Sequence, residues 1–312
     1  MSNFLRIIVV ILAVTFLPSC DDSDDVKSCE SAFPVVTPGQ LFFENSTRLL
    51  MEPELKVGIS CHNCYDANSL ENTFELIEAA IDDDVDVIEL DMVQKNVPST
   101  APVFGHGGNA EGVSYQGLDF ESVVEHELLT FAEQILFLEI KGEIKSKDHI
   151  RNIFNILKKQ ENQFGEMAYF NTQRFTVFRN LTNYDTLSLF RDVLDEAAFL
   201  DIKPFIKLSR IFGESTNNNF INGVLQSYQC GFHMVEFNHQ IGVENISHLT
   251  TYAKLLGIGV NVFTLNEDNY EEITREIIQD VDVLTVDSKG EPIDTRDNES
   301  IFIRIRRLLR GS

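Results

Sequence analysis

The chain has 312 residues, of which 43% are hydrophobic, and a formal net charge of -24 at pH 7. This length suits one large domain or two small ones with a sizeable core. The acidic balance argues against nucleic acid and against unaided binding to anionic lipid, because both are polyanions. An anionic substrate would need a local positive site, which points toward a bound cation.

The N-terminus has the pattern of a targeting segment. Arg6 is followed by an apolar run over residues 7–17, which is too short to span a bilayer. The run ends in LPSC at Cys20, and this resembles a bacterial lipoprotein signal, in which the cysteine becomes the lipidated first residue. An ordinary secretory signal and a single uncleaved anchor are the alternatives. We predict three segments: a signal peptide over 1–20, an acidic tether over 21–50 and a folded domain over 51–312.

These signals predict a membrane-anchored lipoprotein of the cell envelope, facing the periplasm or the exterior. Disulfides are permitted in both places. The remaining cysteines are Cys29, Cys61, Cys64 and Cys230. Four cysteines allow three pairings, and the sequence does not choose among them.

Residues 57–91 predict a strand, a helix and a second strand. The first strand runs from Val57 to Cys61 and is followed by His62. Apolar residues then recur at helical spacing from Leu70 to Ile81, after a start that resembles a capping box. The second strand covers residues 85–91. Two strands joined by one helix suggest a right-handed βαβ unit and a parallel sheet.

Two carboxylates share one face at the end of that second strand. Glu89 and Asp91 are two residues apart, so their side chains point the same way. Parallel strands are usually buried on both faces, and buried carboxylates need a cation or hydrogen bonds. A metal site is the simplest explanation, and a solvated strand end is the alternative.

The rest of the chain continues the alternation of strand and helix. A short strand is expected from Val103 to His106, and a core strand from Ile135 to Lys141 carries Glu139 and Lys141 on one face. A plain salt bridge would explain that pair in isolation. Further strands are expected near 175–178, 198–202, 233–237, 258–265 and 281–286, with helices near 150–157, 185–194, 220–228, 246–256 and 271–278.

About eight parallel-type strands, each followed by a helix, predict an α/β fold of the (β/α)₈ TIM-barrel type. Active sites of this fold lie at the C-terminal ends of the strands. The polar residues at such ends here are His62, Glu89, Asp91, Glu139 and Lys141. The basic stretch over 301–311 is expected to be the last barrel helix with a solvated basic face, or else a membrane-surface helix.

At these residues the chain resembles the glycerophosphodiester phosphodiesterase family, whose barrel is related to that of phosphatidylinositol-specific phospholipase C. That family has a His-Arg-Gly opening, a Glu-Asn-Thr turn, Glu-x-Asp, a His-Asp pair, Glu-x-Lys, Trp-Thr-x-Asn and a final Thr-Asp. The chain has, in the same order, His62, Glu71-Asn72-Thr73, Glu89-Leu90-Asp91, His106, Glu139-Ile140-Lys141, Phe263-Thr264-Leu265-Asn266 and Thr285-Val286-Asp287. Each motif alone is weak, whereas seven in order over residues 56–290 are specific.

The resemblance implies a metal-dependent phosphodiesterase that hydrolyses lipid-derived glycerophosphodiesters to glycerol 3-phosphate and an alcohol. Glu89, Asp91 and Glu139 would hold a divalent cation, Ca²⁺ or Mg²⁺, and all three are hard oxygen ligands. His62 and His106 would serve as acid and base, because imidazole titrates near neutral pH. The sequence does not say which of the two is the base.

Three positions would contact the substrate, and two of them depart from the family pattern. Lys141 would lie beside the phosphate. Asn63 replaces the family arginine and cannot act as a bidentate charged clamp. Phe263 replaces a tryptophan, which keeps an apolar wall and loses a donor. Gly107 stands where the family has an aspartate after the second histidine. Arg179 is either a replacement guanidinium for the phosphate or a solvent-facing side chain.

Three alternatives to this function follow from the same residues. The segment Cys61-His62-Asn63-Cys64 has the spacing of a thiol–disulfide oxidoreductase, although a structural disulfide explains it as well. The changes at Asn63 and Gly107 allow a catalytically weakened barrel that binds a phosphodiester or lipid head group. A related phospholipase with another head group, such as sphingomyelin or a phosphoinositide, is the third.

Overall fold

The computed structural model describes most of the chain after residue 56. The described residues are 57–62, 64, 70–93, 102–105, 118–126, 128–129, 134–164, 176–181, 184–213, 220–277, 281–287 and 300–311. The chain divides into two compact units, Met1–Ser31 and Ala32–Ser312, and all described residues belong to the second. The predicted segment boundaries at residues 20 and 50 lie outside the described residues and stay predictions.

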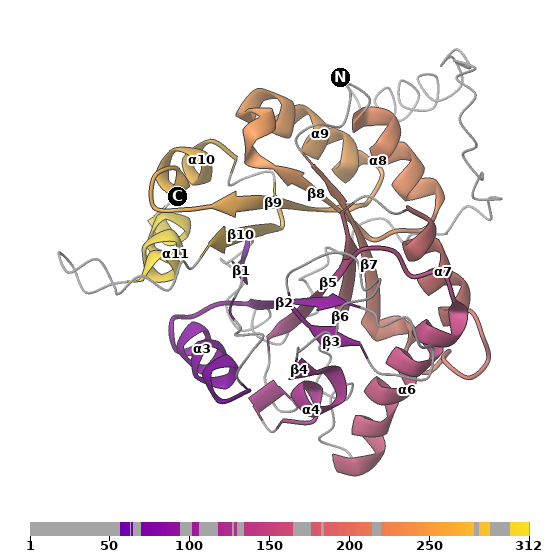
Figure 1. Cartoon of the computed structure of the whole chain (residues 1–312). Helices are drawn as coiled ribbons and strands as arrows, with labels where there is room; N and C mark the ends of the chain where they lie inside the picture. Colours follow the sequence, from indigo (N-terminus) through magenta and orange to yellow (C-terminus); the bar gives the residue numbers. More distant parts are fainter. Residues whose placement is uncertain are drawn as a thin grey trace. The chain divides into compact units, whose positions relative to one another are not determined.

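Among the described residues, eight parallel strands close into a barrel, which confirms the predicted (β/α)₈ TIM barrel (Figure 1). Neighbouring barrel strands pair in the order β1, β10, β9, β8, β7, β6, β5 and β2, and β1 pairs with β2 to close the ring. The strands are β1 Gly58–His62, β2 Val87–Val93, β5 Ile135–Lys141, β6 Thr176–Asn180, β7 Ile206–Phe212, β8 Met234–Asn238, β9 Gly259–Leu265 and β10 Val283–Asp287.

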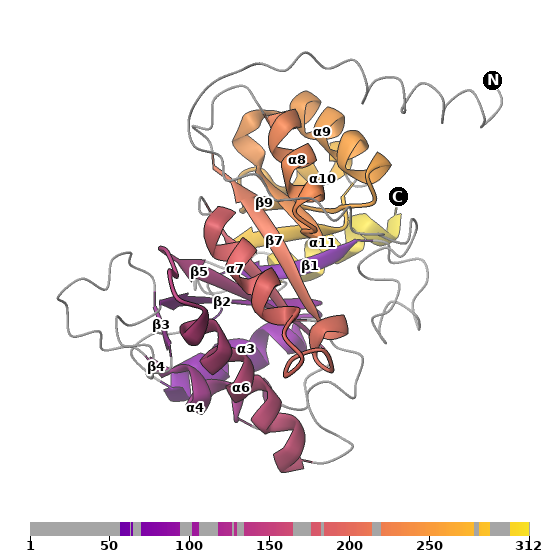
Figure 2. The ribbon, with the colours of Figure 1, turned by 90° about the vertical axis from the view of Figure 1, so that its right-hand side faces the viewer.

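Helices cover the outside of the strands. Figure 2 shows α3, α4 and α6 grouped on one side of the barrel and α8, α9 and α10 on the other. The described helices are α3 Leu70–Asp82, α4 Phe120–Val124, α6 Lys147–Phe164, α7 Tyr184–Leu194, α8 Phe220–Gln229, α9 Val243–Leu255, α10 Tyr270–Ile277 and α11 Ile301–Gly311. Each longer helix turns an apolar stripe toward the sheet, as Phe74 and Ile77 do in α3.

One predicted strand is wrong. Residues 198–202 form turns followed by the 3-10 helix η2 Lys203–Phe205, and the barrel strand is β7, which begins at Ile206. Pro204 suits the start of a short helix, because its missing N–H is not needed there. Lys207 and Ser209 occupy alternate positions of β7, so the strand lacks the apolar pattern that identified the others.

The strand expected at Val103 exists but is not part of the barrel. β3 Val103–Phe104 pairs antiparallel with the end of β2, and β4 Leu118–Asp119 pairs antiparallel with β3. This small extension lies beside the C-terminal end of β2. His106, the residue predicted to end the strand, lies outside the described residues.

The barrel interior is apolar near the start of the strands and polar further along them. Its floor, near the start of the strands, is an apolar cluster of Val87, Ile135, Phe137, Val177, Met234 and Val283. Above it lies a polar layer whose members are at most 2% exposed: Ser60, Glu89, Arg179, Ser209, Glu236, Asn261 and Thr285. Interiors of this fold are usually filled by branched apolar side chains, so a buried polar layer calls for mutual pairing.

Arg306 anchors the last helix, α11, to the N-terminal end of the barrel strands. Arg306 of α11 is 2% exposed, and its Nη2 donates to the carbonyl of Asp84 at 2.9 Å and to the carboxylate of Asp86. Asp86 also accepts from the backbone of Ile59 at 2.8 Å. The helix is where the sequence predicts it, but its basic face is only partly solvated, because Arg306 is buried while Arg307 is exposed.

None of the helices within the described ranges is both long and apolar enough to cross a membrane. The predicted targeting segment and the lipidation residue Cys20 precede the first described residue, so that prediction is untested.

We expect Arg306→Ala to lower the free energy of unfolding by about 3–5 kcal/mol, because it leaves the buried carboxylate of Asp86 without its cation. Arg307→Ala removes the same charge from an exposed position on the same helix and should change stability little. Urea denaturation of both variants measures the difference. An equal loss of unfolding free energy in the two variants would show that Arg306 does not anchor α11.

Candidate active site

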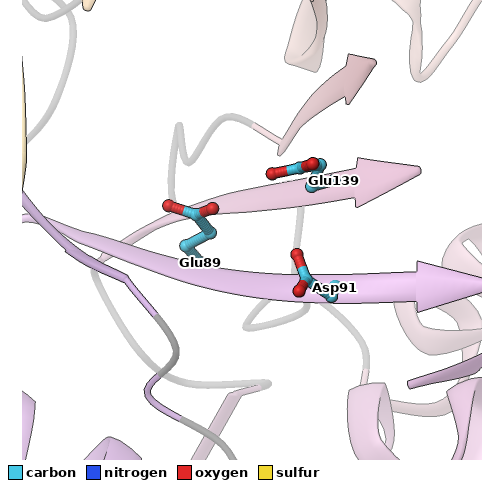
Figure 3. Close-up of side chains that lie close together, drawn as sticks. All are labelled: Glu89, Asp91 and Glu139. Carbon is cyan, nitrogen blue, oxygen red and sulfur yellow. The ribbon is translucent and has the colours of Figure 1, made fainter. Parts of the chain in front are cut away.

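Three carboxylates converge at the C-terminal ends of two neighbouring strands. Glu89 and Asp91 come from β2, and Glu139 comes from β5 in register with Asp91. Figure 3 shows the three side chains on the same side of the two strands, with their carboxylates turned toward one another. One oxygen from each residue lies within 4.8 Å of the others. The structure therefore brings together the predicted metal ligands.

These carboxylates are buried, and this burial decides what they can bind. Glu89 and Asp91 are each 1% exposed. Burial raises the pKa of Glu89, although the positive charge of Arg179 opposes the rise. Within the described part of the chain, Oε2 of Glu89 is buried with no hydrogen-bond partner. Buried, convergent carboxylate oxygens with an unsatisfied atom fit a divalent cation such as Mg²⁺ or Ca²⁺.

Lys141 bridges two members of the triad. Its Nζ lies 2.5 Å from Oε1 of Glu139 and 3.2 Å from Oδ1 of Asp91. Burial alone would lower the pKa of Lys141, but the two carboxylates raise it above its ordinary value. The simple Glu139–Lys141 pair considered from the sequence is present, and it extends to the second strand. Lys141 thus keeps its positive charge at the mouth of the acidic site.

His62 lies between the triad and the last barrel strand. Its Nε2 is 3.9 Å from Oε1 of Glu89, and its Nδ1 is 3.6 Å from Oδ1 of Asp287. Asp287 is the register partner of His62 on β10. Burial opposes protonation of His62, yet Glu89 and Asp287 raise its pKa above the ordinary value. With its side chain 21% exposed, His62 can exchange a proton with a bound molecule.

The sequence allowed two roles for Arg179, a substrate clamp or a solvent-facing side chain. The structure supports neither role. Nη1 of Arg179 lies 2.6 Å from Oε1 of Glu89, and Arg179 forms a two-point pair with Glu236, at 2.8 and 2.6 Å. Glu236 also accepts from Ser209 at 2.5 Å and from Asn261 at 2.7 Å. Because β6 is adjacent neither to β2 nor to β8, these pairs cross the barrel interior.

Sequence reasoning missed Glu236, Ser209 and Asn261. Each stands on a barrel strand between residues that face the helices, as Glu236 does between the buried Val235 and Phe237. A polar residue between two apolar neighbours on a barrel strand indicates a side chain that faces the interior, because side chains alternate along a strand. Asn261 on β9 fits this pattern, whereas Ser209 on β7 lies between Leu208 and Arg210 and does not.

Phe263 is the one predicted substrate-contact residue, besides Lys141, that the structure describes. It lies half-buried near the end of β9, opposite Asn238 on β8. Nδ1 of His239 lies 3.4 Å from the carbonyl oxygen of Phe263, so the 3-10 helix η3 His239–Ile241 after β8 contacts β9. Asn63 and the second predicted catalytic residue, His106, lie outside the described residues, and their roles stay predictions.

The two cysteines that flank His62 pair with each other. Cys61 and Cys64 form a disulfide with their Cα atoms 5.9 Å apart. Their residues are 0% and 3% exposed. Thiol–disulfide exchange requires attack on an accessible sulfur, so this burial favours a structural bridge over redox catalysis. The bridge joins Cys64 to Cys61, which precedes His62 on β1.

The fold and the site together define the class of this protein. It is a (β/α)₈ barrel with a buried acidic site at the carboxyl ends of its strands. No protein-family model matches the sequence, and no curated protein matches it. Solved structures do match.

A glycerophosphodiester phosphodiesterase from Parabacteroides distasonis is 16% identical with a TM-score of 0.52, over 82% of this chain and 98% of that chain. A putative glycerophosphodiester phosphodiesterase from Galdieria sulphuraria is 14% identical with a TM-score of 0.55, over 81% of this chain and 98% of that chain. A putative glycerophosphoryl diester phosphodiesterase from Agrobacterium tumefaciens is 11% identical with a TM-score of 0.56, over 82% and 99%. At these identities the likeness establishes the fold.

We expect a divalent cation to stabilise the folded chain through the triad. At a concentration 100-fold above its dissociation constant, a ligand specific for the folded state adds about 2.7 kcal/mol to the free energy of unfolding. Glu89→Gln keeps the shape of the side chain and removes its charge, so the stabilisation should disappear. Thermal unfolding with Mg²⁺, with Ca²⁺ and with chelator measures the effect. The same upward shift in Glu89→Gln would place the cation elsewhere.

Proposed function

We propose that the chain is a metal-dependent phosphodiesterase that hydrolyses glycerophosphodiesters to glycerol 3-phosphate and an alcohol. The convergence of three buried carboxylates with a histidine and a lysine at the mouth of the barrel carries this proposal. Such a site combines a place for a cation, a proton-transfer group and a positive charge. Phosphoryl chemistry needs all three.

In the proposed reaction a hydroxyl group next to the phosphodiester attacks phosphorus. One histidine takes the proton of that hydroxyl, and the other gives a proton to the departing alcohol; His62 fills one of these roles and His106 is proposed for the other. The cyclic phosphate that forms is then opened by water, with the two histidines exchanging roles. Asp287 holds His62 in place through its Nδ1 side.

Charge on the phosphate oxygens has two sources of compensation. A divalent cation held by Glu89, Asp91 and Glu139 would act as a Lewis acid on a phosphate oxygen. Lys141 supplies a further positive charge from the protein, and its side chain is 18% exposed at the rim of the triad. Both lie at the C-terminal ends of the strands, where the substrate has access.

The proposed substrate class follows from the solved structures that share the fold. The three compared above are named as glycerophosphodiester phosphodiesterases, or putative ones, and each is covered almost completely by this chain. Their identity with this chain is low, so the head group is open. The phosphodiester is the part of the substrate that the described site is equipped to hold.

An assay with a panel of substrates tests the proposed function. A soluble form without residues 1–20 is incubated with glycerophosphocholine, glycerophosphoethanolamine, glycerophosphoinositol and lysophospholipids, in Mg²⁺, Ca²⁺ or chelator. We expect cation-dependent release of a phosphate monoester and an alcohol. His62→Ala should lower the rate by about 10²–10⁴-fold, the usual contribution of a general acid or base. His248→Ala, an exposed histidine of α9, is the matched control.

Two results would contradict the proposal. The first is the absence of turnover for every substrate with either cation, which would favour a binding protein built on the same barrel. The second is turnover that survives His62→Ala and chelation but stops on thiol alkylation, which would favour redox chemistry at Cys61 and Cys64.

We also propose that the protein is anchored to the membrane by a lipid on Cys20 and faces the periplasm or the exterior. The LPSC sequence after a short apolar run supports this proposal. Double acylation gives stable anchoring without a membrane-spanning helix.

Metabolic labelling with a fatty acid should mark the protein in the membrane fraction. Cys20→Ser should abolish the label and release the chain from membranes, whereas Ser23→Ala should keep both. Unlabelled protein in a soluble fraction for both variants and for the unaltered chain would instead indicate an ordinary secretory signal.

A further inference from the structure

Arg179 contacts one of the proposed cation ligands inside the barrel. Its Nη1 lies 2.6 Å from Oε1 of Glu89, and both side chains are almost fully buried. Both oxygens of Glu89 lack a hydrogen bond among the described residues, but Oε1 alone is recorded within ion-pair distance of Arg179. The two oxygens of Glu89 therefore differ, because one faces a protein cation and the other does not.

Arg179 is held too firmly to release that oxygen. Its Nε and Nη2 both pair with Glu236, and its guanidinium lies over the ring of Phe137, with Cζ 5.0 Å from the ring centre. Glu236 is fixed in turn by Ser209 and Asn261. An arginine with a bidentate partner and an aromatic surface has little freedom to turn away.

Lys141 has a different relation to the triad. It lies against Glu139 and Asp91, but its side chain is 18% exposed, and its flexible stem can swing its ammonium toward a bound phosphate. The oxygens that Lys141 engages can thus become available when a cation binds. The oxygen that Arg179 engages cannot.

We propose that Arg179 restricts Glu89 to one ligand oxygen and so makes the site selective for Mg²⁺ over Ca²⁺. Ca²⁺ takes six to eight oxygens and commonly gains one of them from a bidentate carboxylate. Mg²⁺ needs a compact octahedron and accepts single oxygens from carboxylates together with water and phosphate oxygens. With Oε1 of Glu89 occupied by Arg179, Glu89 has one oxygen left for a cation, which matches Mg²⁺. This inference rests on the cation site of the proposed function.

Metal affinities without substrate test the inference separately from catalysis. The full chain is freed of metal with chelator and titrated with Mg²⁺ or Ca²⁺ by calorimetry, and displacement of Mn²⁺ is followed by electron paramagnetic resonance. We expect Mg²⁺ to bind more tightly than Ca²⁺. Equal affinities, or tighter binding of Ca²⁺, would overturn the inference and leave the proposed function standing. Binding of neither ion would overturn both the inference and the cation site.

Two variants test whether Arg179 causes the selectivity for Mg²⁺ over Ca²⁺. Arg179→Met frees the second oxygen of Glu89, so the affinity for Ca²⁺ relative to Mg²⁺ should rise by roughly tenfold or more. The double variant Arg179→Met with Glu236→Met removes both charges of the buried pair, which keeps the net charge of the site and does not leave Glu236 buried without its cation. It should show the same rise.

Arg275→Met on α10 removes the same charge from an exposed position and should leave the relative affinity unchanged. A relative affinity that stays the same in the double variant would overturn the inference. A tighter but unselective binding of both ions in Arg179→Met alone would assign Arg179 a purely electrostatic role and would overturn it too.

Discussion

An arginine buried between two buried glutamates is the interaction on which the barrel interior depends. Arg179 joins Glu89 of β2 to Glu236 of β8 across the centre of the barrel. Each of these charges would be too expensive to bury alone, and together they compensate one another, while Ser209 and Asn261 donate hydrogen bonds to Glu236. The pairing fixes the position of Glu89, and the proposed cation site depends on Glu89 in that position.

The position of each functional group follows from strand alternation. Along β2 the inward side chains are Val87, Glu89 and Asp91, which lie in the apolar floor, the buried polar layer and the mouth of the barrel respectively. The neighbouring strand repeats the change, from Phe137 in the floor to Glu139 at the mouth. Polarity rises toward the carboxyl ends of the strands, which is the end where active sites of this fold lie.

The sequence predicted the barrel and the acidic triad because both depend on local patterns. Apolar strands followed by amphipathic helices gave seven of the barrel strands, and the spacing of Glu89 and Asp91 placed two carboxylates on one face. The prediction failed at β7, where Lys207 and Ser209 face the interior and break the apolar pattern. The partners of Arg179 were missed for a related reason, since Glu236 is far from it in sequence and only closure of the barrel brings them together.

The central claim is that Glu89, Asp91 and Glu139 hold the cation that meets the phosphate. Crystals grown with Mn²⁺ and a non-hydrolysable glycerophosphodiester analogue test this claim most directly through anomalous diffraction. We expect one manganese peak within bonding distance of an oxygen from each of the three residues, with a phosphate oxygen of the analogue completing its shell near His62 and Lys141. A triad without manganese, or an analogue bound away from the mouth of the barrel, would contradict the claim.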